Sequence, residues 1–339
     1  MFVPQRVIFE TGALDYPLGK QLYSRFKEDN LPIIESSLIK IKSNIPGDTA
    51  EALYKSGKST LVVGVKKSLS FQSCKPSAHY QLPLVSGCIG QCEYCYLNTQ
   101  LGDKPFIRVH VNLDEIFQQT DKYITERLPE ETIFEGSATS DPVPVEPYTG
   151  ALKRSITYFA SQENARFRFV TKFTDIDDLL ELEHNNNTEI RFSLNTESII
   201  EAYEHRTASA KKRIEASAKL YSAGYPTGFI IAPVFIYSGW EKEYKELLLT
   251  LRKAYPISAS RPVTFEVISH RYTTKAKNKI TEIFPRTTLD MENEKRQFKY
   301  GQFGYGKYVY PKETIAQIKD FFQREIVEIF ENGEIKYII

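Results

Sequence analysis

Short β-rich runs alternate with segments of helical periodicity between residues 82 and 268. The predicted strands are residues 82–86, 132–136, 167–172, 189–195, 228–234 and 263–268, and the predicted helices are residues 112–128, 149–162, 176–183, 210–223 and 243–254. Strands that alternate with helices form a parallel sheet with right-handed crossovers. Six such units are fewer than the eight of a closed barrel. We therefore predict an α/β fold, a partial (β/α)6 TIM-like barrel.

The rest of the chain predicts two further segments. Residues 1–80 contain a helical stretch, a Pro-Gly turn and an apolar strand at 59–65, and we interpret them as an N-terminal extension packed on the barrel. The barrel itself takes residues 81–270. Residues 271–339 form a basic C-terminal region, in which aromatic residues flank glycines at 298–310 as in a β-hairpin.

Composition limits the class of protein. The chain has 41% hydrophobic residues and no run of 18 or more apolar residues, so we expect a packed core and no membrane span. Its N-terminus lacks the pattern of a signal peptide. Four cysteines, three of them clustered, indicate a reducing cytoplasm and not a disulfide framework.

The clustered cysteines are Cys88, Cys92 and Cys95, spaced C-x3-C-x2-C and followed by an aromatic residue. Three thiolates can hold three irons of a [4Fe–4S] cluster and leave the fourth iron open for a ligand, whereas ferredoxin clusters take four cysteines. A zinc site is an alternative, with Cys74 or one of five histidines as the fourth ligand. Buried thiols are a second alternative, which the glycines of this loop disfavour.

Polar side chains follow the predicted strands at their C-terminal ends, where barrels of this type carry their sites. They include Ser140 after the second strand, Lys172 at the end of the third, and Ser193 and Asn195 at the end of the fourth. Ala232 precedes a proline at the end of the fifth strand. Each has an alternative explanation in turn chemistry, but together they predict one functional rim.

Basic residues are concentrated in two stretches, although the net charge is only +1. Residues 52–92 contain no Asp or Glu, and residues 270–312 contain ten Lys or Arg against four acids. Such patches bind a phosphate backbone or form a solvated surface. In the predicted hairpin, Phe303 could wedge between bases while Lys299 and Lys307 meet phosphates. Alternatively, the hairpin aromatics pack on the barrel.

The cysteine motif resembles the signature of the radical S-adenosylmethionine (SAM) superfamily. Further blocks resemble one family within it, the spore photoproduct lyases: residues 2–5, 16–20, 58–65, 75–78, 94–97, 139–141, 169–173, 212–216 and 306–308. That resemblance implies a DNA repair enzyme of sporulation. It would cleave the ultraviolet-induced thymine dimer 5-thyminyl-5,6-dihydrothymine with a 5′-deoxyadenosyl radical.

The resemblance also implies residue roles. Cys88, Cys92 and Cys95 would bind the [4Fe–4S] cluster, and the SAM pocket would be lined by Ser140, Lys172, Ser193, Asn195 and the backbone around Ala232. Tyr94 and Tyr96 match tyrosines that relay a hydrogen atom back toward SAM. The partners would be DNA containing a thymine photoproduct and a reductant such as flavodoxin or ferredoxin.

The chain departs from the family pattern in three places. Ala138 stands at the position of the family's hydrogen-donating cysteine, residues 142–147 diverge, and Gln302 and Phe303 replace an arginine and a tyrosine at the hairpin tip. The chain would then be a cysteine-to-alanine variant, a lyase with another donor such as Cys74 or a tyrosine, or a paralogue that acts on another nucleic-acid substrate. A non-catalytic iron–sulfur protein that binds DNA is a further alternative.

Overall fold

The computed structural model describes residues 2–255, 261–300 and 306–339. The chain divides into two compact units, which are described separately. Unit 1 comprises Met1–Gln91, Gln100–Thr171 and Asp175–Glu189, and unit 2 comprises Cys92–Thr99, Lys172–Thr174 and Ile190–Ile339. The division into segments 1–80, 81–270 and 271–339 stays a prediction.

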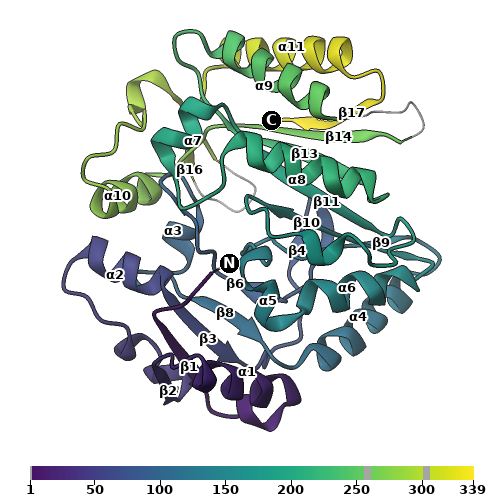
Figure 1. Ribbon diagram of the computed structural model, residues 1–339. Helices are drawn as coiled ribbons and strands as arrows, with labels where there is room; N and C mark the ends of the chain where they lie inside the picture. Colours follow the sequence, from purple (N-terminus) through teal and green to yellow (C-terminus); the bar gives the residue numbers. More distant parts are fainter. Residues whose placement is uncertain (1, 256–260, 301–305) are drawn as a thin grey trace. The chain divides into compact units, whose positions relative to one another are not determined.

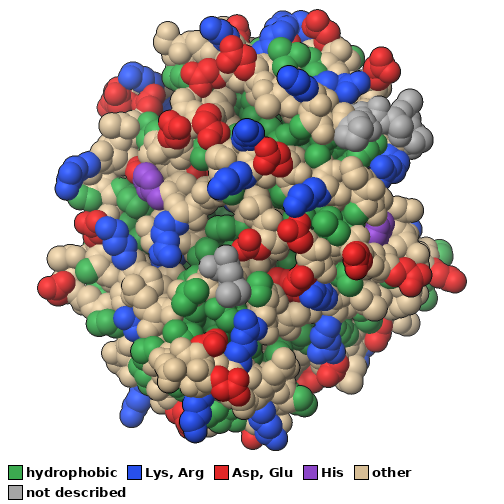
Figure 2. Space-filling model, in the orientation of Figure 1, with side chains coloured by type: hydrophobic (Ala, Val, Ile, Leu, Met, Phe, Trp, Pro, Cys, Tyr) green, Lys and Arg blue, Asp and Glu red, His purple; other side chains and the backbone are tan. Residues whose placement is uncertain are grey.

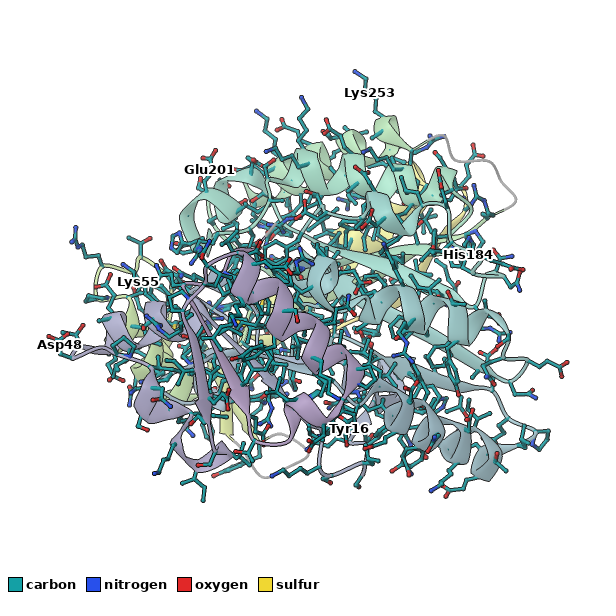
Figure 3. All side chains as sticks on the ribbon, turned by 60° about the horizontal axis from the view of Figure 1, so that its bottom comes forward. Tyr16, Asp48, Lys55, His184, Glu201 and Lys253 are labelled. Atoms are coloured by element: carbon teal, nitrogen blue, oxygen red, sulfur yellow. The ribbon has the colours of Figure 1, made fainter. Side chains whose placement is uncertain are left out.

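Unit 1 contains a five-stranded sheet in the order β2-β1-β3-β8-β6. Its strands are β1 (Arg6–Glu10), β2 (Ile33–Ser36), β3 (Thr60–Gly64), β8 (Ile107–His110) and β6 (Val85–Ser86), and only β6 runs antiparallel to its neighbour. Strand β3 is buried at all five positions, as its apolar sequence predicts. Helices α1 (Pro17–Glu28) and α2 (Ala50–Lys58) belong to the same unit. Figure 3 shows Lys55 of α2 pointing outward.

Gly64 ends β3 beside the ends of two charged side chains. A Cβ placed there would collide with the carboxylate of Glu10 and would lie 2.9 Å from the guanidinium of Arg108. These two side chains form an ion pair. A larger residue here would have to displace the ends of these two flexible side chains.

A second group of strands in unit 1 consists of β4 (Ser73–Cys74), β5 (Ala78–Gln81), β9 (Thr132–Glu135) and β10 (Ala165–Thr171). Strands β5, β9 and β10 are parallel, and β4 pairs antiparallel with β5. Helices α4 (Leu113–Arg127) and α6 (Ala151–Ala160) pack on β9 and β10. The core between them is aromatic: Phe159 lies 5.5 Å from Phe134 and 5.3 Å from Phe167 between ring centroids.

Unit 2 contains the parallel strands β11 (Thr188–Leu194), β13 (Thr227–Val234), β14 (Val263–Ser269) and β17 (Gly333–Ile338). Helices α7 (Glu197–Tyr203), α8 (Ala210–Ser222), α9 (Trp240–Ala254), α10 (Thr274–Ile283) and α11 (Lys312–Ile329) belong to it. Figure 1 shows α9 and α11 side by side above β14 and β17. The ring centroids of Trp240 and Phe321 are 4.9 Å apart at this helix contact.

The predicted hairpin is present in its stem. Strands β15 (Gln297–Tyr300) and β16 (Gly306–Val309) pair antiparallel, with Lys299 opposite Lys307. The predicted tip residues Gln302 and Phe303 lie outside the described residues. Tyr308 of the stem stacks on Tyr272 at 5.3 Å, so this aromatic packs within unit 2.

The first predicted barrel strand, residues 82–86, is wrong: only β6 forms there, and it pairs antiparallel with β8 in the five-stranded sheet. One predicted helix is also wrong. Residues 176–183 contain only the short 3-10 helix η5 (Asp177–Leu179). Asn185 and Asn186, which follow, adopt left-handed backbone angles with φ of 47° and 58°, as asparagines in turns do. No helix within the described ranges is long and apolar enough to cross a membrane.

Candidate active site

The three cysteines of the motif lie on short irregular segments. Cys88 follows β6, Cys92 ends β7 (Gln91–Cys92), and Cys95 precedes α3 (Leu97–Gln100). Cys88 belongs to unit 1, and the other two belong to unit 2. All four cysteines are among the described residues, and none forms a disulfide.

The surroundings of these sulfurs suit thiolate ligands. The Gly90 N–H donates to Cys88 Sγ at 3.3 Å, and Lys172 Nζ donates to Cys92 Sγ at 3.7 Å. Burial raises the pKa of Cys92 to about 11, so coordination to a metal is what would hold this sulfur as a thiolate at neutral pH. Within the described part of the chain, no three Cys, His, Asp or Glu side chains already form a metal-holding group. The cluster ligands therefore stay a prediction.

Backbone contacts fix the two ends of the cysteine loop. In unit 1, the buried Lys58 donates from Nζ to the Cys88 carbonyl at 2.7 Å. In unit 2, the buried Asn98 amide donates to the carbonyls of Cys92 and Glu93 at 3.1 Å each. These bonds satisfy carbonyls of an irregular segment that would otherwise lack partners.

Tyr94 and Lys172 meet in a buried network of unit 2 that is centred on Glu204. Lys172 Nζ donates to the Tyr94 hydroxyl at 2.7 Å and lies 2.9 Å from Glu204 Oε1, to which the Tyr94 O–H donates. Arg213 Nη2 binds Glu204 Oε2 at 2.7 Å. The structure thus brings together two of the predicted site residues.

The charges in this network keep the buried side chain of Glu204 ionised. Burial raises the pKa of Glu204, but the charges of Lys172 and Arg213 outweigh it and lower the pKa to about 2. Burial and the charge of Glu204 raise the pKa of Tyr94 well above its usual range. Tyr94 therefore keeps its O–H at neutral pH. A hydroxyl held in this way can donate hydrogen.

Tyr96 differs from Tyr94 in its exposure. Its side chain is 50% exposed, and its carbonyl accepts a hydrogen bond from Thr99 at 2.8 Å.

Ala138 and Ser140 follow β9 in unit 1, in a loop with buried polar anchors. Ser137 donates to Glu135 Oε1 at 2.6 Å and accepts from the Val170 N–H at 2.7 Å. Asp141 accepts from the Thr171 hydroxyl at 2.9 Å. The Ser140 hydroxyl is buried with no hydrogen-bond partner among the described residues, as expected of a group that meets a ligand.

The remaining predicted cofactor residues lie at strand ends in unit 2. The amide of Asn195 is occupied by the chain itself: it donates to the Pro233 carbonyl at 2.8 Å and accepts from Tyr244 at 2.7 Å. The Ser193 carbonyl accepts from Arg213 at 2.9 Å, and Ala232 lies near the end of β13. These contacts hold the Asn195 amide between the ends of β11 and β13.

Glu204 was missed by the sequence interpretation. A lone Glu before His205 carries no spacing signal, and only the block at residues 212–216, which contains Arg213, pointed toward this region. A second missed group is Glu93, inside the cysteine motif. Its carboxylate binds His205 Nε2 at 2.8 Å and accepts from the Thr287 hydroxyl, both in unit 2.

The predicted DNA-contacting lysines lie on the hairpin stem. Lys299 is exposed, whereas burial and the charges of Arg271 and Lys299 lower the pKa of Lys307. An anion bound near Lys307 would offset the repulsion among these cations. The face seen in Figure 2 carries Lys/Arg and Asp/Glu interspersed, and no single-sign field dominates it.

Comparison with known proteins places the chain in a family. The family model for spore photoproduct lyase matches residues 2–339. The chain is similar to the spore photoproduct lyases of Clostridium acetobutylicum, with 53% identity over 99% of this chain and 98% of the relative, and of Bacillus subtilis, with 45% identity over the same shares.

Solved structures agree with this similarity. A spore photoproduct lyase complexed with dinucleoside spore photoproduct is 44% identical, with a TM-score of 0.97 over 100% of this chain and 99% of that one. A double variant with bound AdoMet and the same dinucleoside is 45% identical, with a TM-score of 0.96 over the same shares. The expected fold class, a partial barrel of the radical SAM type, is confirmed. The chain belongs to the spore photoproduct lyase family.

Proposed function

We propose that this chain is a radical SAM lyase that cleaves 5-thyminyl-5,6-dihydrothymine in DNA. The observation that carries the proposal is the match to the spore photoproduct lyase family over residues 2–339, with C-x3-C-x2-C inside it. Two solved relatives bear the corresponding dinucleoside, and one of them also bears AdoMet.

The chain's own residues would hold the [4Fe–4S] cluster and SAM. Cys88, Cys92 and Cys95 are the proposed cluster ligands, and the proposed SAM-binding residues are Ser140, Lys172, Ser193, Asn195 and Ala232. The donors toward two of the sulfurs and the unpartnered Ser140 hydroxyl support this assignment. When bound, these groups supply a 5′-deoxyadenosyl radical that takes a hydrogen atom from C6 of the lesion.

Cleavage leaves a thymine allyl radical that needs one hydrogen atom, and Ala138 has none to give. We assign this step to Cys74, on β4 of unit 1. Gln72, two residues earlier, lines the same cavity as Ala138. The double variant among the solved relatives combines a cysteine-to-alanine with a serine-to-cysteine replacement. This chain likewise combines an alanine at the donor position with a cysteine elsewhere.

A tyrosine would replace the hydrogen atom that Cys74 loses. The Cys74 S–H bond breaks, a C–H bond forms on thymine, and the sulfur becomes a thiyl radical. Tyr94 and Tyr96, the proposed relay, would restore the thiol from a tyrosine O–H, and the tyrosyl radical would regain its hydrogen from 5′-deoxyadenosine. The contacts of Tyr94 with Lys172 and Glu204 would hold its hydroxyl in place for this transfer.

The test is anaerobic turnover of a defined dinucleotide lesion with SAM and dithionite. We expect thymine as the product. Deoxyadenosine formed without lesion turnover would instead indicate a paralogue with another substrate. DNA binding that survives serine replacement of all three motif cysteines, with no SAM cleavage by the parent protein, would indicate a non-catalytic iron–sulfur protein.

The assignment of Cys74 as the hydrogen donor has its own test. Cys74→Ala should still cleave SAM but should release less thymine and more products trapped at the allyl radical. Adding Ala138→Cys to that variant should restore thymine, because it returns a thiol to the position that the family uses. Unchanged thymine release by Cys74→Ala would exclude Cys74.

Two further elements of the proposal concern the cellular setting. A reductant such as flavodoxin or ferredoxin would deliver the electron to the cluster. The cytoplasm of the spore-forming cell, where DNA and reduced thiols coexist, is the proposed compartment.

A further inference from the structure

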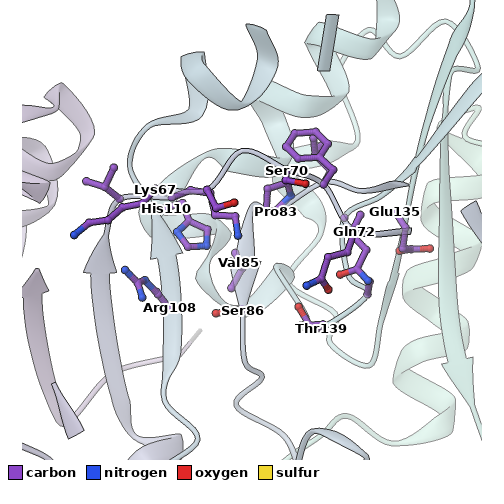
Figure 4. A pocket seen from close by; sticks show the side chains of 18 of the residues that line it. Lys67, Ser70, Gln72, Pro83, Val85, Ser86, Arg108, His110, Glu135 and Thr139 are labelled. Carbon is purple, nitrogen blue, oxygen red and sulfur yellow. The ribbon is translucent and has the colours of Figure 1, made fainter. Parts of the chain in front are cut away.

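Unit 1 contains a polar cavity of about 400 Å³ whose lining includes Ala138 and Thr139. Figure 4 shows its walls: Lys67, Ser70 and Gln72 come from the segment after β3, Arg108 and His110 from β8, and Thr139 from the loop after β9. Lys66 also lines it. The lining therefore joins three cations to the loop that carries the position of the family's hydrogen donor.

The cations of this cavity exceed the carboxylates that face them. Glu10 pairs with Arg108 and lies 3.6 Å from Lys67 Nζ. Glu135, on the opposite wall, accepts from Ser137 at 2.6 Å and lies 3.8 Å from Arg168. Lys66 has no carboxylate within ion-pair distance in the described ranges, and Arg108 Nε is buried there without a hydrogen-bond partner.

His110 adds a second unsatisfied group to the same wall. The side chain is 6% exposed, and its Nδ1 has no hydrogen-bond partner in the part of the chain that the structure describes. A neutral imidazole offers one N–H donor and one acceptor. Buried polar groups in proteins are nearly always paired, so an unpaired ring nitrogen beside a cavity indicates a ligand.

We propose that this cavity binds a phosphate group of the DNA backbone next to the lesion. The inference rests on the proposed function, because only a DNA substrate would bring a phosphate to the loop of Ala138. Lys66 and Arg108 supply charge, and Ser70, Thr139 and Gln72 supply neutral donors. The lesion in the solved relatives is a dinucleoside, which contains no phosphate, so those complexes leave such a subsite unassigned.

Electrostatics support the same ligand. Burial and, after it, the charge of Arg108 lower the pKa of Lys66. Because Glu10 already pairs with Arg108, Lys66 is the cation that a bound anion would stabilise. Burial and the charges of Arg108 and Lys66 also lower the pKa of His110, to about 3, which keeps the ring neutral, and its Nδ1 donates to an anion in the tautomer that carries the proton there.

The experiment compares a dinucleoside lesion with the same lesion inside an oligonucleotide, using the cluster-loaded enzyme. The measured quantity is the ratio of kcat/KM for the oligonucleotide to kcat/KM for the dinucleoside. Lys66→Gln should lower this ratio roughly tenfold, because one charged contact to phosphate is lost. The salt dependence of oligonucleotide binding should also weaken by about one phosphate contact.

The matched control is Lys122→Gln on α4, an exposed lysine outside the cavity, which should leave the ratio unchanged. Neutral methylphosphonate linkages, introduced one at a time beside the lesion, should reduce the ratio at one linkage for the parent enzyme and not for Lys66→Gln. Thermal melting of each variant confirms that it is folded.

Two outcomes would overturn the inference. An unchanged ratio for Lys66→Gln, with lesion turnover intact, removes the phosphate subsite and leaves the lyase function standing. Equal inhibition of dinucleoside and oligonucleotide turnover by inorganic phosphate would show that the site takes free anions and not the DNA backbone. Failure of the parent enzyme on every lesion would defeat the proposed function instead, and the salt dependence of oligonucleotide binding would then still decide the phosphate site.

Discussion

At the scale of single residues, the buried carboxylate of Glu204 organises the chemistry of unit 2. It pairs with both Lys172 and Arg213 and accepts from the Tyr94 hydroxyl. Two buried cations around one carboxylate are stable only while that charge is present, because desolvated charges need partners. Removing the charge affects both the fold and the position of Tyr94.

Glu204→Gln should therefore lower the free energy of unfolding by about 3 kcal/mol, since it leaves two buried cations without a counter-charge. Urea unfolding of the protein at neutral pH measures this change. Glu201→Gln is the control, because Glu201 is exposed on α7 and projects outward in Figure 3. Equal stability of the two variants would contradict the role assigned to Glu204.

The same region shows what sequence can and cannot reveal about a site. Lys172 and Ser140 were predicted as site residues because polar residues after parallel strands collect at one edge of a sheet. Tyr94 was predicted from the cysteine motif and the family blocks. Glu204 was not, because tertiary structure alone brings it to Tyr94 from 110 positions away in sequence.

At the scale of elements, the start of α6 depends on a carboxylate from the preceding helix. Gly150 provides no side-chain cap there, and Glu146 of α5 (Glu146–Thr149) accepts from the N–H groups of Leu152 and Lys153 at 2.7 and 2.9 Å. Burial raises the pKa of Glu146 to about 7, although these two bonds oppose the shift. The folded state therefore retains the proton over a range where the unfolded chain has lost it.

Stability should consequently fall as pH rises from 4.5 to about 7, by at most roughly 3 kcal/mol from this group. Glu146→Gln removes that dependence, so its stability relative to the parent protein should rise across this window. Denaturant unfolding at several pH values measures the difference. Glu163→Gln, at an exposed position, should run parallel to the parent protein, and a parallel curve for Glu146→Gln would refute the assignment.

Elements with strong periodicity were predicted well and weakly patterned ones were not. The amphipathic repeat located α4 and α8 to within two residues at each end, since burial of one helix face imposes that repeat. The segment at 176–183 shows a similar pattern, but the asparagines that follow it favour a turn. Helix α11, which buries Phe321 and Phe322, was not predicted. The basic residues before it led to an interpretation of this region as a nucleic-acid-binding segment.

At the scale of the whole molecule, each unit contains one deeply buried histidine. Burial and neighbouring cations lower the pKa of His110 in unit 1 and of His270 in unit 2 to about 3. Arg108 and Lys66 are the cations near the first ring, and Arg296 and Arg271 are those near the second. Both rings are thus neutral in the folded protein over a pH range where the unfolded chain protonates them.

Acid should therefore destabilise both units. Stability falls as pH drops below 6.5, because the unfolded state then binds more protons, and at pH 5 each histidine should cost about 2 kcal/mol. The double variant His110→Asn and His270→Asn should show a shallower acid loss in thermal melting. His184→Asn is the control, because Figure 3 shows His184 at the outside of the molecule. A steep loss that persists in the double variant would contradict this account.

Gly64, which has no side chain, affects how Glu10 and Arg108 are placed beside the cavity. Even a methyl group at position 64 would strike the Glu10 carboxylate and crowd the arginine that reaches it. Alanine there would move the ends of these two side chains, one of which lines the cavity. Because the atoms in the way are the ends of flexible side chains, we expect alanine at the last position of β3 to be accommodated by a shift of the Glu10–Arg108 pair.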